Sequence, residues 1–229
     1  MEKHMTEVRF PQIKICGITR KQEIDWLLAL PVDYIGMVLF FPKSKRNLTV
    51  EQAVSLVQYA KGQNQSRSPR LVAVMVSPDA EQIRQVVQIG FDCIQIHGRI
   101  KPDIVKEIKI PLIRAYNMKE ERETFCELAG LREKDVVVEG CLFDAPQPGS
   151  GQSFDWSMLP ARREGRAEKI FLAGGLCAQT VSEAIRQVYP DVVDVSSAVE
   201  AVTQDGSFQG KDREKIIEFV DAVKKSGKK

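Results

Sequence analysis

The sequence has few cysteines, and they form no recognisable pattern. The five lie far apart, at Cys16, Cys93, Cys126, Cys141 and Cys177. Because their number is odd and no Cys-x-x-Cys pair occurs, the sequence argues against a disulfide framework and against a zinc site. Reduced thiols are typical of the cytosol, so we expect a cytoplasmic protein without a metal ion.

Long apolar runs and a large excess of one charge are also missing. No run reaches the length of a membrane span, and residues 1–11 lack the apolar core of a signal peptide. The formal net charge is +2, whereas a nucleic-acid-binding surface usually gives a strong basic excess. The sequence therefore predicts neither a membrane nor a nucleic acid as partner.

What the chain does contain is a series of eight short apolar runs, nearly all separated by stretches of helical period. The runs are rich in Val, Ile, Leu and Phe without strict alternation, as in parallel strands buried on both faces. They cover residues 12–16, 34–40, 71–76, 93–96, 112–116, 136–143, 170–172 and 193–195. Eight such units favour a single-domain α/β fold, the (β/α)8 TIM barrel, over an open doubly wound sheet. We expect residues 1–11 to be an N-terminal extension and residues 12–229 to form the barrel domain.

Capping residues mark the ends of several predicted helices. The clearest helical stretches cover residues 21–30, 50–60, 79–89, 119–129, 180–188 and 212–225. Thr19 and Thr49 are expected N-caps, because a threonine hydroxyl can accept from a free backbone N–H. Gly90 and Gly130 are expected to end the helices before them.

Two reactive side chains stand where predicted strands end, which is the catalytic face of a barrel. Cys16 ends the first run; a lone cysteine is more often a buried hydrophobe, but the strand end favours a functional role. Lys14 lies on the same face, deeper in the barrel, where it could hold a thiolate or a substrate anion. Asp144 follows the sixth run and is either a turn cap or a general acid whose pKa burial would raise.

Small residues follow the seventh and eighth runs, where many barrels bind phosphate. They are Gly174, Gly175, Ser196 and Ser197. Glycine lets backbone N–H groups approach an anion, and a short helix beginning there would add its positive end. The two motifs together predict a small phosphorylated substrate.

Arg46 and His97 are two further candidates for substrate binding. Arg46 closes the basic loop after the second run, which is either a solvated face or an anion clamp; a guanidinium pairs with a carboxylate through two hydrogen bonds. His97 directly follows the fourth run and is expected to be a hydrogen-bonded histidine at the site or its rim.

Taken together, these segments resemble the phosphoribosylanthranilate isomerases, enzymes of tryptophan biosynthesis. The matching pieces, in order, are KICGIT (14–19), YIGMVLFFPKSKR (34–46), QIHG (95–98), FDAPQPGSGQSFDW (143–156), LAGGL (172–176) and DVSSAVE (194–200). The resemblance implies a barrel that converts N-(5-phosphoribosyl)anthranilate to 1-(2-carboxyphenylamino)-1-deoxyribulose 5-phosphate. This Amadori rearrangement is an isomerisation of the aldose–ketose type, and the family implies no cofactor or metal.

The resemblance also implies roles for single residues. Cys16 would be the general base that removes the C2 proton, and Asp144 the general acid that protonates the ring oxygen. Arg46 would anchor the anthranilate carboxylate. The chain departs from the family at Ala198, where glycine is usual; alanine would be costly if that position needs a positive φ.

Two other functions remain open from the sequence. One is a different phosphate-binding barrel, such as an indole-glycerol-phosphate synthase or a different aldose–ketose isomerase. Such a synthase would be expected to carry catalytic Lys and Glu at strand ends. The other is a catalytically silent barrel that binds a sugar phosphate and serves a partner, favoured only by Ala198. The sequence does not distinguish a monomer from a homodimer, nor does it exclude the related substrate of histidine biosynthesis.

Overall fold

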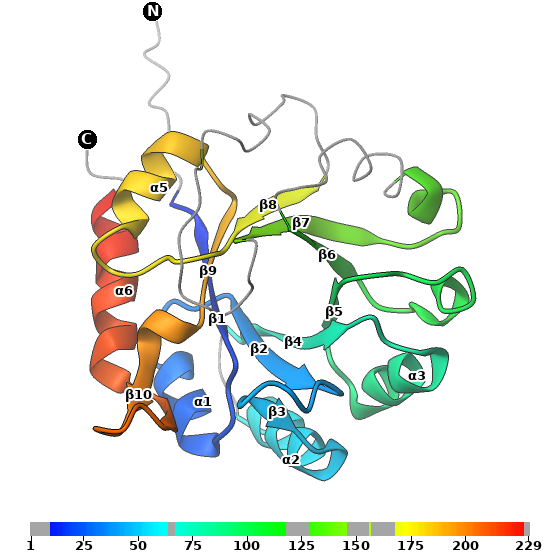
Figure 1. The fold of residues 1–229 in the computed structure, drawn as a ribbon, viewed down its shortest axis with the longest axis horizontal. Helices are drawn as coiled ribbons and strands as arrows, with labels where there is room; N and C mark the ends of the chain where they lie inside the picture. The colour runs from blue at the N-terminus through cyan, green and yellow to red at the C-terminus, as the bar shows by residue number, and fades with distance from the viewer. Residues whose placement is uncertain (1–9, 64–66, 118–128, 146–155, 157–167, 227–229) are drawn as a thin grey trace, which may run out of the picture.

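The computed structural model describes residues 10–63, 67–117, 129–145, 156 and 168–226. Within them, eight parallel strands close into a barrel, because each strand pairs with the next and the last pairs with the first (Figure 1). The strands are β1 (Gln12–Cys16), β2 (Tyr34–Leu39), β4 (Arg70–Val76), β5 (Cys93–His97), β6 (Leu112–Asn117), β7 (Val138–Asp144), β8 (Lys169–Leu172) and β9 (Val192–Val195). The predicted barrel is confirmed, and each predicted run matches one of its strands.

Helices surround the strands, and α5 and α6 lie side by side on one flank (Figure 1). They are α1 (Lys21–Leu28), α2 (Val50–Lys61), α3 (Ala80–Ile89), α5 (Val181–Val188) and α6 (Arg213–Ser226), with short 3-10 turns η1 (Val105–Glu107) and η3 (Ser197–Val199). In the described part of the chain no helix is both long and apolar enough to cross a membrane.

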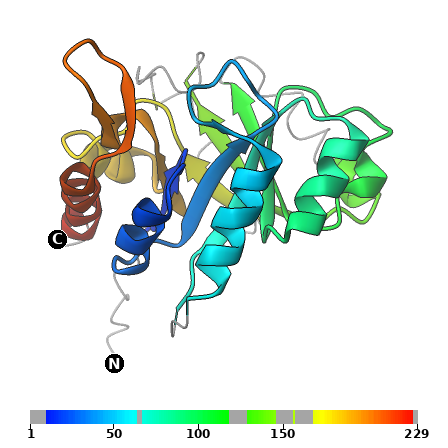
Figure 2. The ribbon, with the colours of Figure 1, turned by 90° about the horizontal axis from the view of Figure 1, so that it is seen from below.

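Three short strands are additions that the sequence analysis did not predict. They are β3 (Asn47–Leu48), which pairs with β2, and a hairpin of β10 (Glu200–Val202) and β11 (Phe208–Lys211). Figure 2 shows this hairpin and the segment between β2 and β3 rising on the same face of the barrel. That face carries the C-terminal ends of the barrel strands, so both additions border the expected site.

The helix ends agree with the sequence at α2 and α3 but not at α1. Thr49 caps α2, and Gly90 ends α3 with a φ of 93°. The prediction for Thr19 is wrong, because the N-cap of α1 is Arg20. The carboxylate of Glu23 accepts from the backbone N–H groups of Thr19 (2.7 Å) and Arg20 (3.1 Å), so a threonine hydroxyl is not needed there.

The prediction that Gly130 ends a helix is also wrong. Most of the stretch 119–129 lies outside the described residues, but residues 129–132 are helical, so Gly130 lies inside a helix. The chain reverses later, at Asp135, which has a φ of 61°, and the N–H of Val136 bonds the carbonyl of Leu131. Aspartate tolerates this left-handed conformation better than most residues, so no glycine is required.

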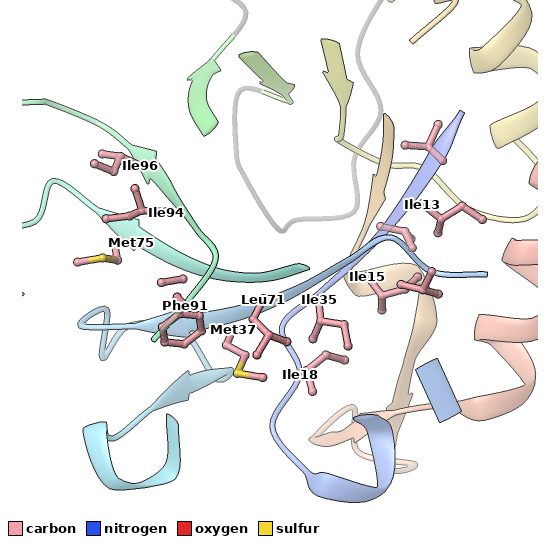
Figure 3. Close-up of a cluster of buried hydrophobic side chains, with 14 of the residues drawn as sticks. Ile13, Ile15, Ile18, Ile35, Met37, Leu71, Met75, Phe91, Ile94 and Ile96 are labelled. Carbon is pink, nitrogen blue, oxygen red and sulfur yellow. The ribbon is translucent and has the colours of Figure 1, made fainter. Parts of the chain in front are cut away.

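Alternation along the strands divides the core into two layers. Side chains such as Ile13, Ile15, Ile35 and Met37 point outward and pack in a cluster between strands and helices (Figure 3). A second cluster fills the barrel interior: Cys16, Tyr34, Val38, Val72, Val74, Cys93, Ile113, Ala115, Leu142, Phe171, Ala173 and Val192. Because successive strand residues face opposite sides, the outward isoleucines of β1 direct Lys14 and Cys16 into the barrel.

An ion cluster closes the interior at the N-terminal ends of the strands. The carboxylate of Glu139 pairs with Lys169 (2.8 Å) and Arg70 (2.7 Å), and the hydroxyl of Tyr34 donates to it at 2.8 Å. Burial alone would raise the pKa of Glu139, but these partners lower it to about 2. Burial raises the pKa of Tyr34 to about 12. The cluster lies at the end of the barrel where polar groups serve stability rather than catalysis.

Candidate active site

A cavity of about 370 Å³ lies at the C-terminal ends of the barrel strands. The eight residues singled out from the sequence all line it: Cys16, Arg46, His97, Asp144, Gly174, Gly175, Ser196 and Ser197. The wall also contains Gln95 and Asp194, which the sequence analysis did not select. The fold therefore brings together residues that lie up to 181 positions apart (Cys16 to Ser197).

Cys16 is the last residue of β1 and is 8% exposed. A side chain at Gly36 on β2 would place its Cβ 2.8 Å from Sγ, so glycine is needed there to leave room for the thiol. Burial raises the pKa of Cys16, while the positive charge of Lys14 lowers it. In the free protein the sulfur is therefore a thiol, with a cation beside it that favours its ionisation.

Asp144 ends β7 and is also buried, at 8% exposure. Its Oδ1 accepts from the backbone N–H of Ala145 at 2.8 Å. Gly174 packs against this peptide with a φ of 80°, and a Cβ there would lie 2.6 Å from the Ala145 nitrogen. Burial, and then the negative charge of Asp194, raise the pKa of Asp144 to about 6, so the carboxyl can carry a proton close to neutral pH.

A buried ion pair lies beneath these two side chains. Lys14 on β1 and Asp194 on β9 are opposite each other in register, and Nζ lies 2.7 Å from Oδ2. The Lys14 side chain is fully buried and that of Asp194 is 7% exposed. Asp194 Oδ1 has no partner among the described residues. The sequence does contain a signal for Asp194. It is an acidic residue inside the apolar run VVDV, and a buried lysine is expected on a neighbouring strand.

His97 is held by a neighbour from its own strand. Gln95 Nε2 and His97 Nε2 lie 2.8 Å apart, as expected for two residues on one face of β5. Burial lowers the pKa of His97 to about 4, and the charges of Lys14 and Arg114 act in the same direction. His97 is therefore a neutral imidazole, which can exchange a hydrogen bond but carries no charge. Oε1 of Gln95 finds no partner in the described ranges.

Arg46 is oriented by a carboxylate that the sequence analysis missed. Its Nε donates to Oε1 of Glu200, which is 3% exposed. Glu200 also pairs with Lys45 at 2.8 Å and lies 3.6 Å from the ammonium of Lys211. Nη2 of Arg46 is buried and has no partner in the part of the chain that the structure describes. Glu200 thus holds the guanidinium through Nε, and Nη2 can donate to a bound anion.

The glycines and serines after β8 and β9 form another part of the cavity wall. Gly174 and Gly175 have positive φ values of 80° and 67°. The hydroxyl of Ser196 donates to the carbonyl of Cys16 at 3.0 Å, and Lys211 Nζ donates to the carbonyl of Ser196 at 2.9 Å. Burial lowers the pKa of Lys211 to about 8. These contacts tie the serine segment to the strand that carries the thiol.

Ala198 does not strain this segment. It lies inside η3, and its φ is not among the positive values of the chain. The conformational cost considered for alanine at this position therefore does not arise. Its side chain packs against the hydrophobic core.

The site is suited to proton transfer and anion binding. Over the described residues, no group of three or more His, Cys, Asp or Glu side chains could hold a metal ion. The cavity instead combines a thiol, a carboxyl of raised pKa and an arginine with one donor that no described residue accepts from. An acid and a base on one wall can act on different atoms of one bound molecule.

Comparison with known proteins shows where this arrangement recurs. Residues 13–222 match the family described as N-(5'-phosphoribosyl)anthranilate (PRA) isomerase. The N-(5'-phosphoribosyl)anthranilate isomerase of Streptococcus mutans is 35% identical over 215 residues, which cover 93% of this chain and 99% of that protein.

Solved structures agree with the sequence match. Monomers of the dimeric phosphoribosylanthranilate isomerase of Thermotoga maritima align with a TM-score of 0.73 and 30% identity, covering 94% of this chain and 99% of that one. A phosphoribosylanthranilate isomerase in complex with reduced 1-(o-carboxyphenylamino)-1-deoxyribulose 5-phosphate aligns with a TM-score of 0.69 and 27% identity, with the same coverage of 94% and 99%. Because the match spans nearly the whole barrel and every strand that contributes to the cavity, this chain belongs to the N-(5'-phosphoribosyl)anthranilate isomerase family.

Proposed function

We propose that this protein catalyses the Amadori rearrangement of N-(5-phosphoribosyl)anthranilate to 1-(2-carboxyphenylamino)-1-deoxyribulose 5-phosphate in tryptophan biosynthesis. The observation that carries the proposal is the placement of a buried thiol, Cys16, and a buried carboxyl, Asp144, on the wall of one cavity. Membership of the isomerase family supports the choice of substrate.

Asp144 acts first, as the general acid. Its raised pKa keeps part of the population protonated, so the carboxyl can give a proton to the ring oxygen of the ribose. The bond between C1 and that oxygen then breaks, and the lone pair of the anthranilate nitrogen forms a Schiff base with C1. Gly174 allows the peptide of Ala145 to lie against the carboxylate and hold Oδ1 while the proton leaves.

Cys16 acts second, as the general base. Its thiolate removes the proton from C2, the electrons of the C–H bond form the C1=C2 double bond of an enolamine, and the π electrons of the C1=N bond return to nitrogen. A proton then adds to C1 while the C2 hydroxyl loses its proton, which gives the ketone. The buried ammonium of Lys14 favours the thiolate, which is the form of cysteine that can accept a proton.

The two ends of the substrate are held by groups that do no chemistry. Backbone N–H groups of Gly174, Gly175, Ser196 and Ser197 hold the phosphate, and Nη2 of Arg46 binds the anthranilate carboxylate. His97, as a neutral imidazole on the wall, contributes a hydrogen bond to the substrate. Holding both ends fixes the reacting carbons between acid and base.

Loss of the carboxylate that orients Arg46 should weaken substrate binding more than it slows chemistry. We expect Glu200→Gln to raise KM about tenfold with kcat nearly unchanged, because the guanidinium loses a charged hydrogen bond but stays in place. Steady-state kinetics measure this effect. Arg46→Lys, which keeps the charge but loses the planar fork, should raise KM further. A fall in kcat with constant KM in both variants would contradict the assignment.

The remaining expectations about partners and location belong to the same proposal. The protein acts in the cytoplasm on a small phosphorylated molecule, without metal, organic cofactor, nucleic acid or membrane. Residues 1–11 form an extension to the barrel domain of residues 12–229. A monomer and a homodimer are both compatible with the site, because every group in the mechanism comes from one chain; sedimentation analysis distinguishes the two.

Turnover of the named substrate tests the function directly. Purified protein should consume freshly prepared phosphoribosylanthranilate, which is followed as a loss of anthranilate fluorescence. The gene should also restore growth of a tryptophan auxotroph that lacks this step. Absence of both results, with binding of the reduced product analogue retained, would favour the catalytically silent barrel.

A further inference from the structure

The mechanism above uses the ammonium of Lys14 but gives no role to Asp194, the other member of this buried pair. A fully buried ammonium with one carboxylate 2.7 Å away is expensive to desolvate, and apolar side chains could fill the same interior position. The pair also leaves Asp194 Oδ1 without a partner among the described residues, although Asp194 lines the cavity. A purely structural ion pair would be expected to satisfy both oxygens.

The position of the pair connects it to both reactive groups. Lys14 lies two residues before Cys16 on the inward face of β1, so its ammonium lies beneath the thiol. Asp194 faces the same cavity as Asp144, and the negative charges of the two carboxylates interact. Of the two charges, that of Lys14 has the larger effect on the pKa of Cys16, and that of Asp194 has the larger effect on the pKa of Asp144.

We propose that Lys14 and Asp194 are positioning residues that set the protonation of the acid and the base in opposite senses. The ammonium of Lys14 stabilises the thiolate of Cys16, and the carboxylate of Asp194 keeps a proton on Asp144. This inference rests on the proposed function for its catalytic meaning, but the arrangement itself exists without substrate.

The other charges near the thiol do not replace this pair. Cys16 is faced by Lys14 and Asp194 from β1 and β9, by Lys211 from β11 and by Arg46 from the segment after β2. Lys211 is engaged with the carbonyl of Ser196 (2.9 Å), and Arg46 is bound to Glu200. Lys14 has the largest effect of these cations on the thiol.

Around Asp144 the charges are fewer. Its carboxyl is faced by Asp194 from β9 and by Lys14 from β1, while the N–H of Ala145 favours the ionised form. Of these, only Asp194 opposes ionisation. Removing its charge should therefore make Asp144 a stronger acid in the free enzyme.

Alkylation of Cys16 by iodoacetamide, measured on its own peptide by mass spectrometry, tests the proposal without substrate. At a pH below the pKa of the thiol, the alkylation rate is proportional to the fraction of thiolate. Lys14→Met should raise the pKa of Cys16 and so lower the rate at least about tenfold. Asp194→Asn should increase the rate, because the buried ammonium is then left with the thiolate as its nearest anion. Opposite changes in two variants of one pair would not follow from a general loss of structure.

Two further variants make the result decisive. Lys14→Met/Asp194→Leu replaces the pair by apolar side chains, which proteins often tolerate without loss of stability. Because the two charges act on the thiol in opposite directions, this variant should alkylate at a rate between those of Lys14→Met and Asp194→Asn. Lys169→Met removes an ion pair at the other end of the barrel and should leave the rate unchanged.

Kinetics give the second readout. A general acid loses activity as the pH rises through its pKa, so Asp144 determines the alkaline limb of the pH profile of kcat/KM. In Asp194→Asn this limb should move to lower pH. The variant should also lower kcat by a larger factor than it changes KM. Alkylation rates of Lys14→Met and Asp194→Asn that both equal the wild-type rate, in folded protein, would overturn the proposal. Inactive wild-type protein would refute the proposed function instead, and the alkylation rates would still decide whether the pair controls Cys16.

Discussion

Asp144→Asn should remove nearly all turnover and at the same time make the folded protein more stable near neutral pH. The amide has nearly the same shape and can still accept from the N–H of Ala145, but it cannot give a proton to the ring oxygen. General acid catalysis contributes about 10²- to 10⁴-fold, so we expect kcat to fall by that range. Cys16→Ser should lower kcat by a similar factor. A hydroxyl is a much weaker acid than a thiol, so serine does not ionise to supply the base.

The gain in stability follows from the direction of the pKa shift. The pKa of Asp144 rises from 3.8 to about 6 on folding, so the folded state binds the proton more tightly than the unfolded state. The tighter binding of this proton stabilises the folded state fully at a pH below 3.8, the unfolded pKa. This stabilisation is lost as the pH rises through about 6, the folded pKa. Above that pH the buried carboxylate costs about 2–3 kcal/mol, which the neutral amide avoids.

Chemical denaturation of wild-type and Asp144→Asn protein across this pH range measures the effect. The two free energies of unfolding should be similar in acid and diverge as the pH rises, with the variant the more stable. A matched control is Asp79→Asn, the exposed N-cap of α3, whose side chain does not line the cavity; comparison with it tests whether the divergence belongs to Asp144. If Asp144→Asn retains turnover, or loses stability at every pH, the carboxyl is not the buried acid described here.

Glu139→Gln should destabilise the fold without affecting the chemistry. Glu139 receives a hydrogen bond from Tyr34 and ion pairs from Arg70 and Lys169, and its carboxylate is only 14% exposed. Its pKa falls from 4.5 to about 2 on folding. Because the partner cations are partly exposed and solvent screens their charge, we expect Glu139→Gln to lower the free energy of unfolding by about 2 kcal/mol near neutral pH.

The pH dependence of this variant has the opposite sign to that of Asp144. Because folding lowers the pKa of Glu139, its contribution is present above the unfolded value of 4.5 and is lost as the pH falls towards about 2. Wild-type protein and Glu139→Gln should therefore approach the same stability in acid. Glu81→Gln removes an exposed ion pair with Arg84 and should change stability little at any pH. A fall in kcat for Glu139→Gln would show that this end of the barrel is coupled to the site.

Local patterns were sufficient to predict the fold. Continuous apolar runs at β2 and β4 identify buried parallel strands, because no solvent-facing side imposes alternation. The helix ends were less predictable, since tertiary contacts chose among several possible caps. At α1 the carboxylate of Glu23, which also accepts from the backbone of Lys211, displaced Thr19. After residues 129–132 the turn came at Asp135 rather than at Gly130.

The site was predictable in its reactive groups but not in their supports. Cys16 and Asp144 stand at strand ends, which sequence order reveals once eight strands are counted. Asp194 and Glu200 were missed because each is a polar residue within or beside an apolar run, and its partner lies on another strand or loop. Such a partner is defined only by strand register and by the path of the loops.

The sequence alone determined the barrel, the family motifs and the strand ends at which chemistry can occur, because these depend on local hydrophobic pattern and on residue order. Only the tertiary structure decided the charge states, since burial and neighbouring charges exist only after closure. Closure places Lys14 opposite Asp194 and leaves Asp144 with a pKa of about 6. The tertiary structure also shows that Ala198 does not have a positive φ, and the identity of the residue alone cannot reveal this.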